Sequence, residues 1–128
     1  MKSKMIIAIS LLGGIAIGVA GSQALRAQAK PPAYVIAEID VTNQDAYTAE
    51  YAPLAKKILT EGGGTYLVRG GKTAAMDGDA PPNRIAVIAF DSFDKAQAVY
   101  TSQVYRDARK IGEKYAKFRV YVAEGVSP

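Results

Sequence analysis

The order of strand-like and helix-like segments is the feature that most constrains the fold of this chain. Segments with the alternation or apolar character of β-strands cover Ala33–Val41, Thr65–Arg69, Arg84–Phe90 and residues 117–125. A short edge strand is also expected over residues 72–76. Segments with helical spacing separate the first long strand from the second, and the third from the fourth. The order β-α-β-β-α-β predicts an α+β, ferredoxin-like fold, in which helices cover one face of a four-stranded antiparallel sheet.

The first helical region has clear start and stop signals and one irregularity. Thr42 or Asn43 is suited to cap its N-terminus, and the glycines at 62–64 end it. Pro53 lies inside the helical pattern. Because proline lacks a backbone N–H, we expect a kink near residues 51–52.

Alternation along the strands assigns their side chains to the two faces of the sheet. The face under the helices is expected to hold Val35, Ala37, Ile39, Val41, Ile85, Val87, Ala89, Val120 and Val122. The other face is expected to hold Tyr34, Ile36, Glu38, Asp40, Thr65, Leu67, Arg69, Arg84, Ala86, Ile88, Phe90, Arg119, Tyr121 and Ala123. An apolar surface this broad is typical of an interface. We therefore predict a homodimer with twofold symmetry, whose sheets pack face to face around a polar-lined cavity.

The beginning of the chain has the organisation of an export signal. Lys2 and Lys4 form a basic start, residues 5–21 are apolar and uncharged, and Ala27-Gln28-Ala29 matches a signal-peptidase site. We expect a periplasmic or secreted protein after cleavage near Ala29. Contact with a membrane is expected only through a signal that stays uncleaved.

Cleavage leaves one small domain with little net charge. The chain divides into a signal peptide (1–29), a linker (30–33) and a folded domain (34–128). The signal contains three of the 16 basic residues and none of the 12 acidic ones, so its removal lowers the formal net charge from +4 to +1. A domain near neutrality lacks the basic surface that nucleic-acid phosphates require, and we expect no nucleic-acid partner.

The composition excludes several kinds of chemistry. The chain contains no His and no Cys, which excludes imidazole or thiol catalysis, zinc sites with nitrogen or sulfur ligands, and His- or Cys-ligated haem. Asp77, Asp79 and Asp91 lack the spacing of a calcium-binding EF-hand. Gly71-Lys72-Thr73 is not the end of a phosphate-binding loop, because Tyr66 occupies the place of its first glycine. We therefore predict neither a metal nor a cofactor.

Several short patterns, taken in order, resemble a known family. They are Tyr47 and Tyr51 on the first helix, the glycines before a strand that ends in Arg69-Gly70-Gly71, Arg84 at the start of the central strand, the Ser-x-x-Tyr of Ser102 and Tyr105, and Glu124-Gly125. Together they resemble domain-of-unknown-function family 1330, in the dimeric α/β-barrel group of ferredoxin-like folds. The resemblance covers nearly all of the mature chain and implies a homodimer, but it implies no established reaction. The family pattern often has an arginine where this chain has Gly112.

The predicted cavity would bring together candidate residues for a small-molecule site. These candidates are Tyr34, Glu38, Tyr51, Arg69, Arg84, Phe90, Tyr105 and Tyr121. The two arginines are suited to clamp a carboxylate or another anion, and the aromatic rings are suited to form apolar walls. The most direct hypothesis is therefore a binding protein for a small organic molecule.

Two other functions stay open at this point. The resemblance to dimeric α/β-barrel proteins implies a cofactor-free enzyme of monooxygenase or isomerase type, with Glu38 as the base and Arg69 or Arg84 stabilising an enolate. The other is a purely structural dimer whose cavity is filled by side chains. An open pocket that holds both an arginine and an acid favours binding or catalysis, whereas a packed interface favours the structural function.

Overall fold

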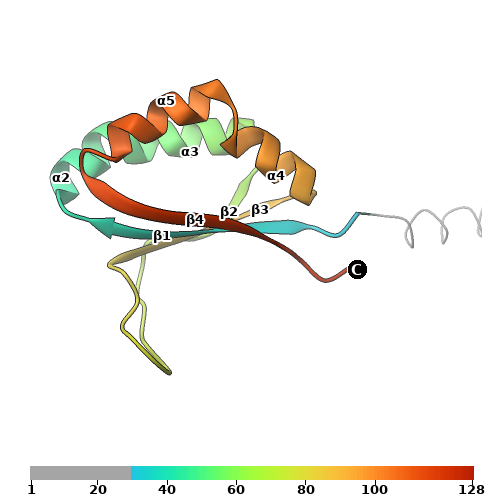
Figure 1. Ribbon diagram of the computed structural model, residues 1–128, viewed down its shortest axis with the longest axis horizontal. Coiled ribbons are helices and arrows are strands. Elements are labelled where there is room, and N and C mark those ends of the chain that lie inside the picture. Colours follow the sequence, from blue (N-terminus) through green and yellow to red (C-terminus); the bar gives the residue numbers. More distant parts are fainter. Residues whose placement is uncertain (1–29) are drawn as a thin grey trace, which may run out of the picture. The chain divides into compact units, whose positions relative to one another are not determined.

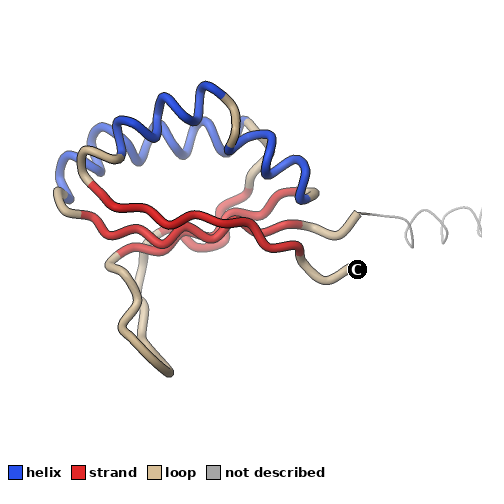
Figure 2. The backbone as a smooth tube through the Cα atoms, in the orientation of Figure 1, coloured by secondary structure: helices blue, strands red, loops and turns tan. Residues whose placement is uncertain are grey.

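Four antiparallel strands form one sheet in the order β2-β3-β1-β4, and the helices lie on one of its faces (Figures 1 and 2). The computed structural model describes residues 30–128, of which 31–126 form a compact unit. The strands are β1 (Ala33–Val41), β2 (Thr65–Arg69), β3 (Arg84–Phe90) and β4 (Ala116–Glu124). The helical segments are α2 (Gln44–Ala46), the π-helical turn η1 (Tyr47–Tyr51), α3 (Ala52–Glu61), α4 (Phe93–Tyr100) and α5 (Gln103–Gly112).

This arrangement is the predicted ferredoxin-like α+β fold. The predicted signal peptide lies outside the described residues. Within residues 30–128, no helix combines the length and the hydropathy required to cross a bilayer.

The first helical region buries two tyrosines around an irregular turn. Asn43 caps it by accepting a hydrogen bond from the Ala46 backbone N–H at 3.1 Å. The irregularity predicted before Pro53 is the π-helical turn η1, in which the Ala52 N–H donates to the Tyr47 carbonyl. Tyr47 and Tyr51 stand at the two ends of this turn and are only 2% and 4% exposed.

Two serines fix the starts of α4 and α5. Ser92 accepts a hydrogen bond from the Lys95 N–H at 3.2 Å, and Ser102 accepts one from the Tyr105 N–H at 3.4 Å. The Ser-x-x-Tyr pattern therefore contains the N-cap of α5. Because Ser102 starts the helix, the buried side chain of Tyr105 lies in its first turn.

The faces predicted for β1 and β4 are confirmed, whereas β3 is turned the other way. Val35 lies opposite both Ile88 and Val122, so all three share the helix-covered face. The buried residues of β3 are Ala86, Ile88 and Phe90. The prediction was wrong for Ile85, Val87 and Ala89, which lie on the open face. Since β3 is a central strand with apolar side chains on both faces, alternation alone does not fix its orientation.

A β-bulge also turns the end of β2 over. Tyr66 pairs with Ile88 but Val68 pairs with Val87, so the register shifts by one residue between them. Beyond the bulge, Arg69 lies opposite Ala86 on the helix-covered face. Alternation places Arg69 on the open face, and the extra residue in the strand overturns this prediction.

The segment between β2 and β3 is a long exposed loop that projects away from the helices (Figure 1). Gly70 and Gly71 have φ values of +69° and +89° and direct the chain out of the sheet. The edge strand predicted at 72–76 consequently does not form, and residues 71–80 are all exposed. Asn83 secures the end of the loop, because its side chain accepts from the Val41 N–H at 2.8 Å and donates to the Val41 carbonyl at 2.9 Å.

Candidate functional site: a tyrosine and arginine cavity under the helices

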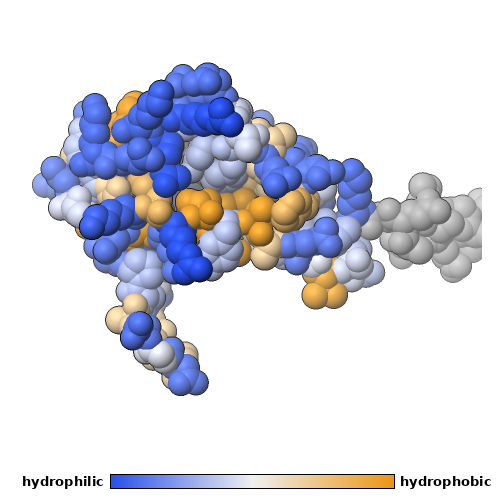
Figure 3. Space-filling view, in the orientation of Figure 1, coloured by the Kyte–Doolittle hydropathy of each residue, from blue (hydrophilic) through white to orange (hydrophobic). Residues whose placement is uncertain are grey.

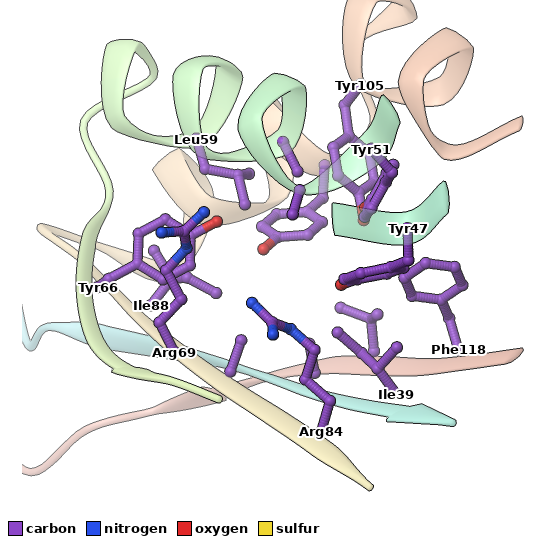
Figure 4. Close-up of a pocket in the computed structure, with 16 residues that line it drawn as sticks. Ile39, Tyr47, Tyr51, Leu59, Tyr66, Arg69, Arg84, Ile88, Tyr105 and Phe118 are labelled. Carbon is purple, nitrogen blue, oxygen red and sulfur yellow. The ribbon is translucent and has the colours of Figure 1, made fainter. Parts of the chain in front are cut away.

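A small cavity lies between the helices and the sheet (Figure 4). Its volume is about 30 Å³, enough for one or two water molecules. Two arginines and five tyrosines supply its polar atoms: Arg69, Arg84, Tyr47, Tyr51, Tyr66, Tyr100 and Tyr105. Apolar side chains from the sheet and α3, among them Ile39, Leu59 and Ile88, complete its walls.

Arg84 reaches the cavity from the first position of β3. It lies opposite Ile39 on the helix-covered face. Its guanidinium carbon is 5.2 Å from the centre of the Tyr47 ring, within the range of a cation–π contact, and its charge acts to lower the Tyr47 pKa. A Cβ at Gly70 would come within 3.2 Å of a terminal nitrogen of Arg84. Glycine at this position therefore serves both the positive φ of the turn and the close approach of the arginine.

Arg69 enters the same cavity from the end of β2, beyond the bulge. Its guanidinium carbon is 5.5 Å from the centre of the Tyr66 ring, within the range of a cation–π contact. Figure 4 shows both guanidinium groups directed toward the tyrosine side chains. Arg69 is exposed and Arg84 is half-buried, so Arg69 lies on the side where the cavity meets solvent.

The buried tyrosines act as neutral hydrogen-bond donors at ordinary pH. Burial raises the pKa of Tyr51 and of Tyr100 far above the usual value of 10.0. Burial also raises the pKa values of Tyr47 and Tyr66, against the opposing effect of the nearby arginines. The neighbouring Tyr105 raises the Tyr51 pKa further. These four hydroxyls therefore stay protonated and cannot serve as anionic bases near neutral pH.

Two positive charges face the cavity without a negative one. The lining contains no Asp and no Glu. The ion pairs between described side chains involve Lys95, Arg109, Lys110 and Arg119, and neither Arg69 nor Arg84 takes part in one. Guanidinium groups donate hydrogen bonds and have no acceptor atoms, and the protonated tyrosine hydroxyls can donate as well. This set of donors is suited to a carboxylate or a similar planar anion.

Four of the eight predicted site residues line this cavity: Tyr51, Arg69, Arg84 and Tyr105. They gather under the helices, whereas the predicted cavity lies on the open face of the sheet. The difference follows from the orientation of β3 and from the bulge in β2, which together carry both arginines to the helix-covered face.

The other four predicted residues lie elsewhere. Phe90 is buried in the adjacent core, with its ring edge-on to Tyr100 at a centroid distance of 6.2 Å. The remaining three belong to the open face: Tyr34, Glu38 and Tyr121. The Glu38 carboxylate is 3.6 Å from Arg119 on the same face. The predicted acid and the predicted arginines are therefore separated by the sheet.

Sequence reasoning misses Tyr47, Tyr66 and Tyr100 as cavity residues. Tyr47 is detectable in principle, because it precedes Tyr51 by about one helical turn on the same face. Tyr66 shares a face with Arg69 only because of the bulge, and no local pattern indicates that bulge. Tyr100 is the last residue of α4, where helical periodicity has ended.

The described part of the chain offers no obvious metal centre. No three His, Cys, Asp or Glu side chains within residues 30–128 gather where a metal ion could bind. The cavity itself presents two guanidinium groups, which repel cations.

Sequence comparison establishes the family. Residues 32–126 match the family model described as "Domain of unknown function (DUF1330)". The chain belongs to the DUF1330 family. Every strand and every residue that lines the cavity falls within this DUF1330 domain. No curated protein matches the sequence significantly.

Solved structures with low sequence identity share the DUF1330 fold seen here. A protein of unknown function from Rhodopseudomonas palustris is 16% identical, with a TM-score of 0.60 over 85% of this chain and 94% of that one. SnoaB, a cofactor-independent oxygenase from Streptomyces nogalater, is 7% identical, with a TM-score of 0.55 over 77% and 96%. An EthD family protein from Bacillus halodurans is 16% identical, with a TM-score of 0.52 over 74% and 99%. At these identities the likeness shows the fold alone.

Proposed function

We propose that this DUF1330 protein binds a small organic anion, best a carboxylate, in the cavity between its helices and its sheet. The observation that carries the proposal is the convergence of Arg69 and Arg84 on a space whose lining has no acidic residue. Two like charges in a partly buried site repel each other. A carboxylate between them would relieve that repulsion and form charge-assisted hydrogen bonds, with further donation from tyrosine hydroxyls.

The two arginines are suited to different parts of the binding process. Arg84 is positioned beforehand by Tyr47 and by the space beside Gly70, so little side-chain freedom is lost when a ligand binds. Arg69 is exposed at the end of its strand and can meet an anion at the mouth of the cavity. We therefore assign the stronger contribution to Arg84.

Arg84→Ala is expected to weaken benzoate binding by a factor of about 10 to 150, as measured by isothermal titration calorimetry. This range corresponds to one hydrogen bond to a charged group, about 1.5–3 kcal/mol. Arg84→Lys keeps the charge but loses the planar fork, so its affinity should fall between those of the wild type and Arg84→Ala. Arg106→Ala changes an exposed arginine of α5 and serves as the matched control, with wild-type affinity expected.

Benzoate and acetate are suitable probes because both present a carboxylate without other polar groups. If Arg84→Ala and the double variant Arg69→Ala/Arg84→Ala bind both as the wild type does, the arginines are not the site. If the wild type binds neither probe, the anion-binding proposal fails and the purely structural dimer becomes the better interpretation.

The cavity does not support catalysis with Glu38 as the base. Glu38 lies on the open face beside Arg119, on the other side of the sheet from Arg69 and Arg84. The cavity lining has no carboxylate that could replace it. Similarity of fold to a cofactor-independent oxygenase does not transfer that activity. Binding is therefore the function that this geometry favours.

We further propose that the open face of the sheet packs against a second copy of the chain. Ile36, Ile85 and Val87 lie half-buried on that face, and Tyr121 is 43% exposed there. An apolar sheet face of this kind is usually covered in the native assembly. Light scattering is expected to give twice the mass of the mature chain, and Ile36→Lys is expected to give the monomer mass. A monomeric wild type would contradict the proposal.

For the location of the protein, we propose export followed by cleavage after Ala29. The support is the basic, apolar and small-residue organisation of residues 1–29 in the sequence. Mass spectrometry of the protein from a periplasmic fraction should show a chain that begins at Lys30. The full-length mass in that fraction would argue for a retained signal.

A further inference from the structure

A second hollow adjoins the cavity on the far side of two tyrosines. It runs along the edge strand β4, beneath α4 and the start of α5, and has a volume of about 250 Å³. Figure 3 shows apolar surface between the helices and the sheet on this side of the molecule. We call this hollow the β4 groove. Val35, Val120 and Val122 supply its apolar floor, and Gln97 and Thr101 lie at its helical side.

The β4 groove and the cavity have three wall residues in common: Tyr100, Tyr105 and Val120. The rings of Tyr100 and Tyr105 lie 4.5 Å apart between centroids and form the partition. Tyr105 is only 5% exposed, so packing holds it in place. Tyr100 is half-buried at the end of α4, and within residues 30–128 its position rests on ring contacts with Phe90 and Tyr105.

The volumes limit what the cavity can hold by itself. A space of about 30 Å³ admits a carboxylate group but no ring. Ligand sites in proteins usually have volumes of about 300–1,000 Å³. The β4 groove, at about 250 Å³, supplies the missing space next to the cavity. A ligand whose anionic group reaches Arg84 therefore has room for its body only if that body lies in the groove or in solvent.

The charges in the β4 groove do not compete for the anion. Arg109 is the one charged residue in its lining. Its guanidinium stacks on Phe118, 4.0 Å from the ring centre, and its Nε atom is 3.6 Å from the Glu113 carboxylate. Arg109 thus has an acidic neighbour, although its Nε has no hydrogen-bond partner, whereas neither cavity arginine takes part in an ion pair among the described side chains. The apolar surface lies in the groove.

We propose that the cavity and the β4 groove form one binding site for an arylalkyl carboxylate, a flat apolar ring joined by a short chain to a carboxylate. The carboxylate binds to Arg84 and Arg69, and the ring lies on Val35, Val120 and Val122. Tyr100 moves aside so that the chain passes between the two spaces. This inference rests on the proposed anion-binding function and names its ligand class.

The test compares acids of increasing length by isothermal titration calorimetry. The wild type is expected to bind 3-phenylpropanoate about tenfold or more tightly than acetate, since the phenyl ring buries apolar surface. Val122→Phe fills the groove and should weaken 3-phenylpropanoate binding about tenfold while acetate binding stays within about twofold. Gln97→Trp fills the groove from an exposed helix position and should also weaken only 3-phenylpropanoate binding. This variant tests the proposal if Val122→Phe does not fold. Ala98→Trp, exposed on α4 outside this groove, is the control.

The outcomes separate this inference from the function on which it rests. If Arg84→Ala weakens both acids but neither groove variant affects 3-phenylpropanoate, the anion site stands and the arylalkyl assignment is wrong. Equal affinity of the wild type for acetate and 3-phenylpropanoate also overturns it. If Arg84→Ala affects neither acid, both proposals fail together.

Discussion

Above about pH 10, the free energy of unfolding is expected to fall steeply, because buried tyrosines resist ionisation in the folded state. Their pKa values are raised by burial, most of all those of Tyr51 and Tyr100. Below pH 10 the hydroxyls are protonated in both states and contribute no pH dependence. Above it, the unfolded chain releases protons that the folded protein retains, so stability decreases with rising pH.

The size of this effect follows from linkage. A tyrosine that stays protonated in the folded state up to pH 12 lowers the free energy of unfolding by about 2.3 kcal/mol between pH 10 and 12, since each pH unit well above 10 corresponds to 1.36 kcal/mol. Urea unfolding at pH 8, 10, 11 and 12 measures the decrease. Tyr51→Phe and Tyr100→Phe should each flatten the slope above pH 10, although both change stability little at pH 8. A slope that neither variant alters would show that these hydroxyls ionise normally in the folded protein.

Gly112→Arg is expected to destabilise the fold by more than about 3 kcal/mol, because this buried position has no room for a side chain. A Cβ at Gly112 would lie 2.7 Å from Cδ1 of Tyr51 and 2.9 Å from Cζ of Phe118. Both rings pack against each other at a centroid distance of 5.4 Å and line the cavity. An arginine side chain at this position cannot enter the packing unless Tyr51 moves.

Gly112→Ala tests the crowding at this position more directly, because helix propensity and crowding change the stability in opposite directions and the sign of the change shows which is larger. Helix propensity favours alanine over glycine by up to about 1 kcal/mol. Crowding of Tyr51 and Phe118 costs about 1–3 kcal/mol. We expect net destabilisation in thermal and urea unfolding, while Lys114→Ala, exposed just beyond α5, leaves stability nearly unchanged. A stabilised Gly112→Ala would mean that the rings give way easily and that the position tolerates a side chain.

Local signals predict the elements of this fold well. The alternation of β1 identifies its buried face, and the capping side chain of Asn43 starts the first helical region where expected. Pro53 correctly indicates an irregular turn. Each of these features is set by residues close together in the sequence, which explains why the sequence reveals them.

The candidate site was predicted less well, because its geometry depends on pairing between strands. β3 is apolar on both faces, so only its register with β1 shows that Arg84 lies under the helices. The bulge in β2 moves Arg69 to the same face without a recognisable sequence signal. Both arginines were therefore correctly named as cavity residues, but the prediction placed them on the wrong face of the sheet.

The bulge in β2 also makes the pairing register of that strand a determinant of charge placement. Residues on either side of Leu67 follow opposite phases of the pleat, so Tyr66 and Arg69 share a face although three positions separate them. If the strand paired without the bulge at its present length, Leu67 would lie opposite Val87 and Arg69 would lie on the open face. Loss of Leu67 would instead remove the bulge and leave Arg69 opposite Ala86 on the helix-covered face. The pairing of this short strand, rather than the identity of its side chains, thus decides which compartment of the protein is positively charged.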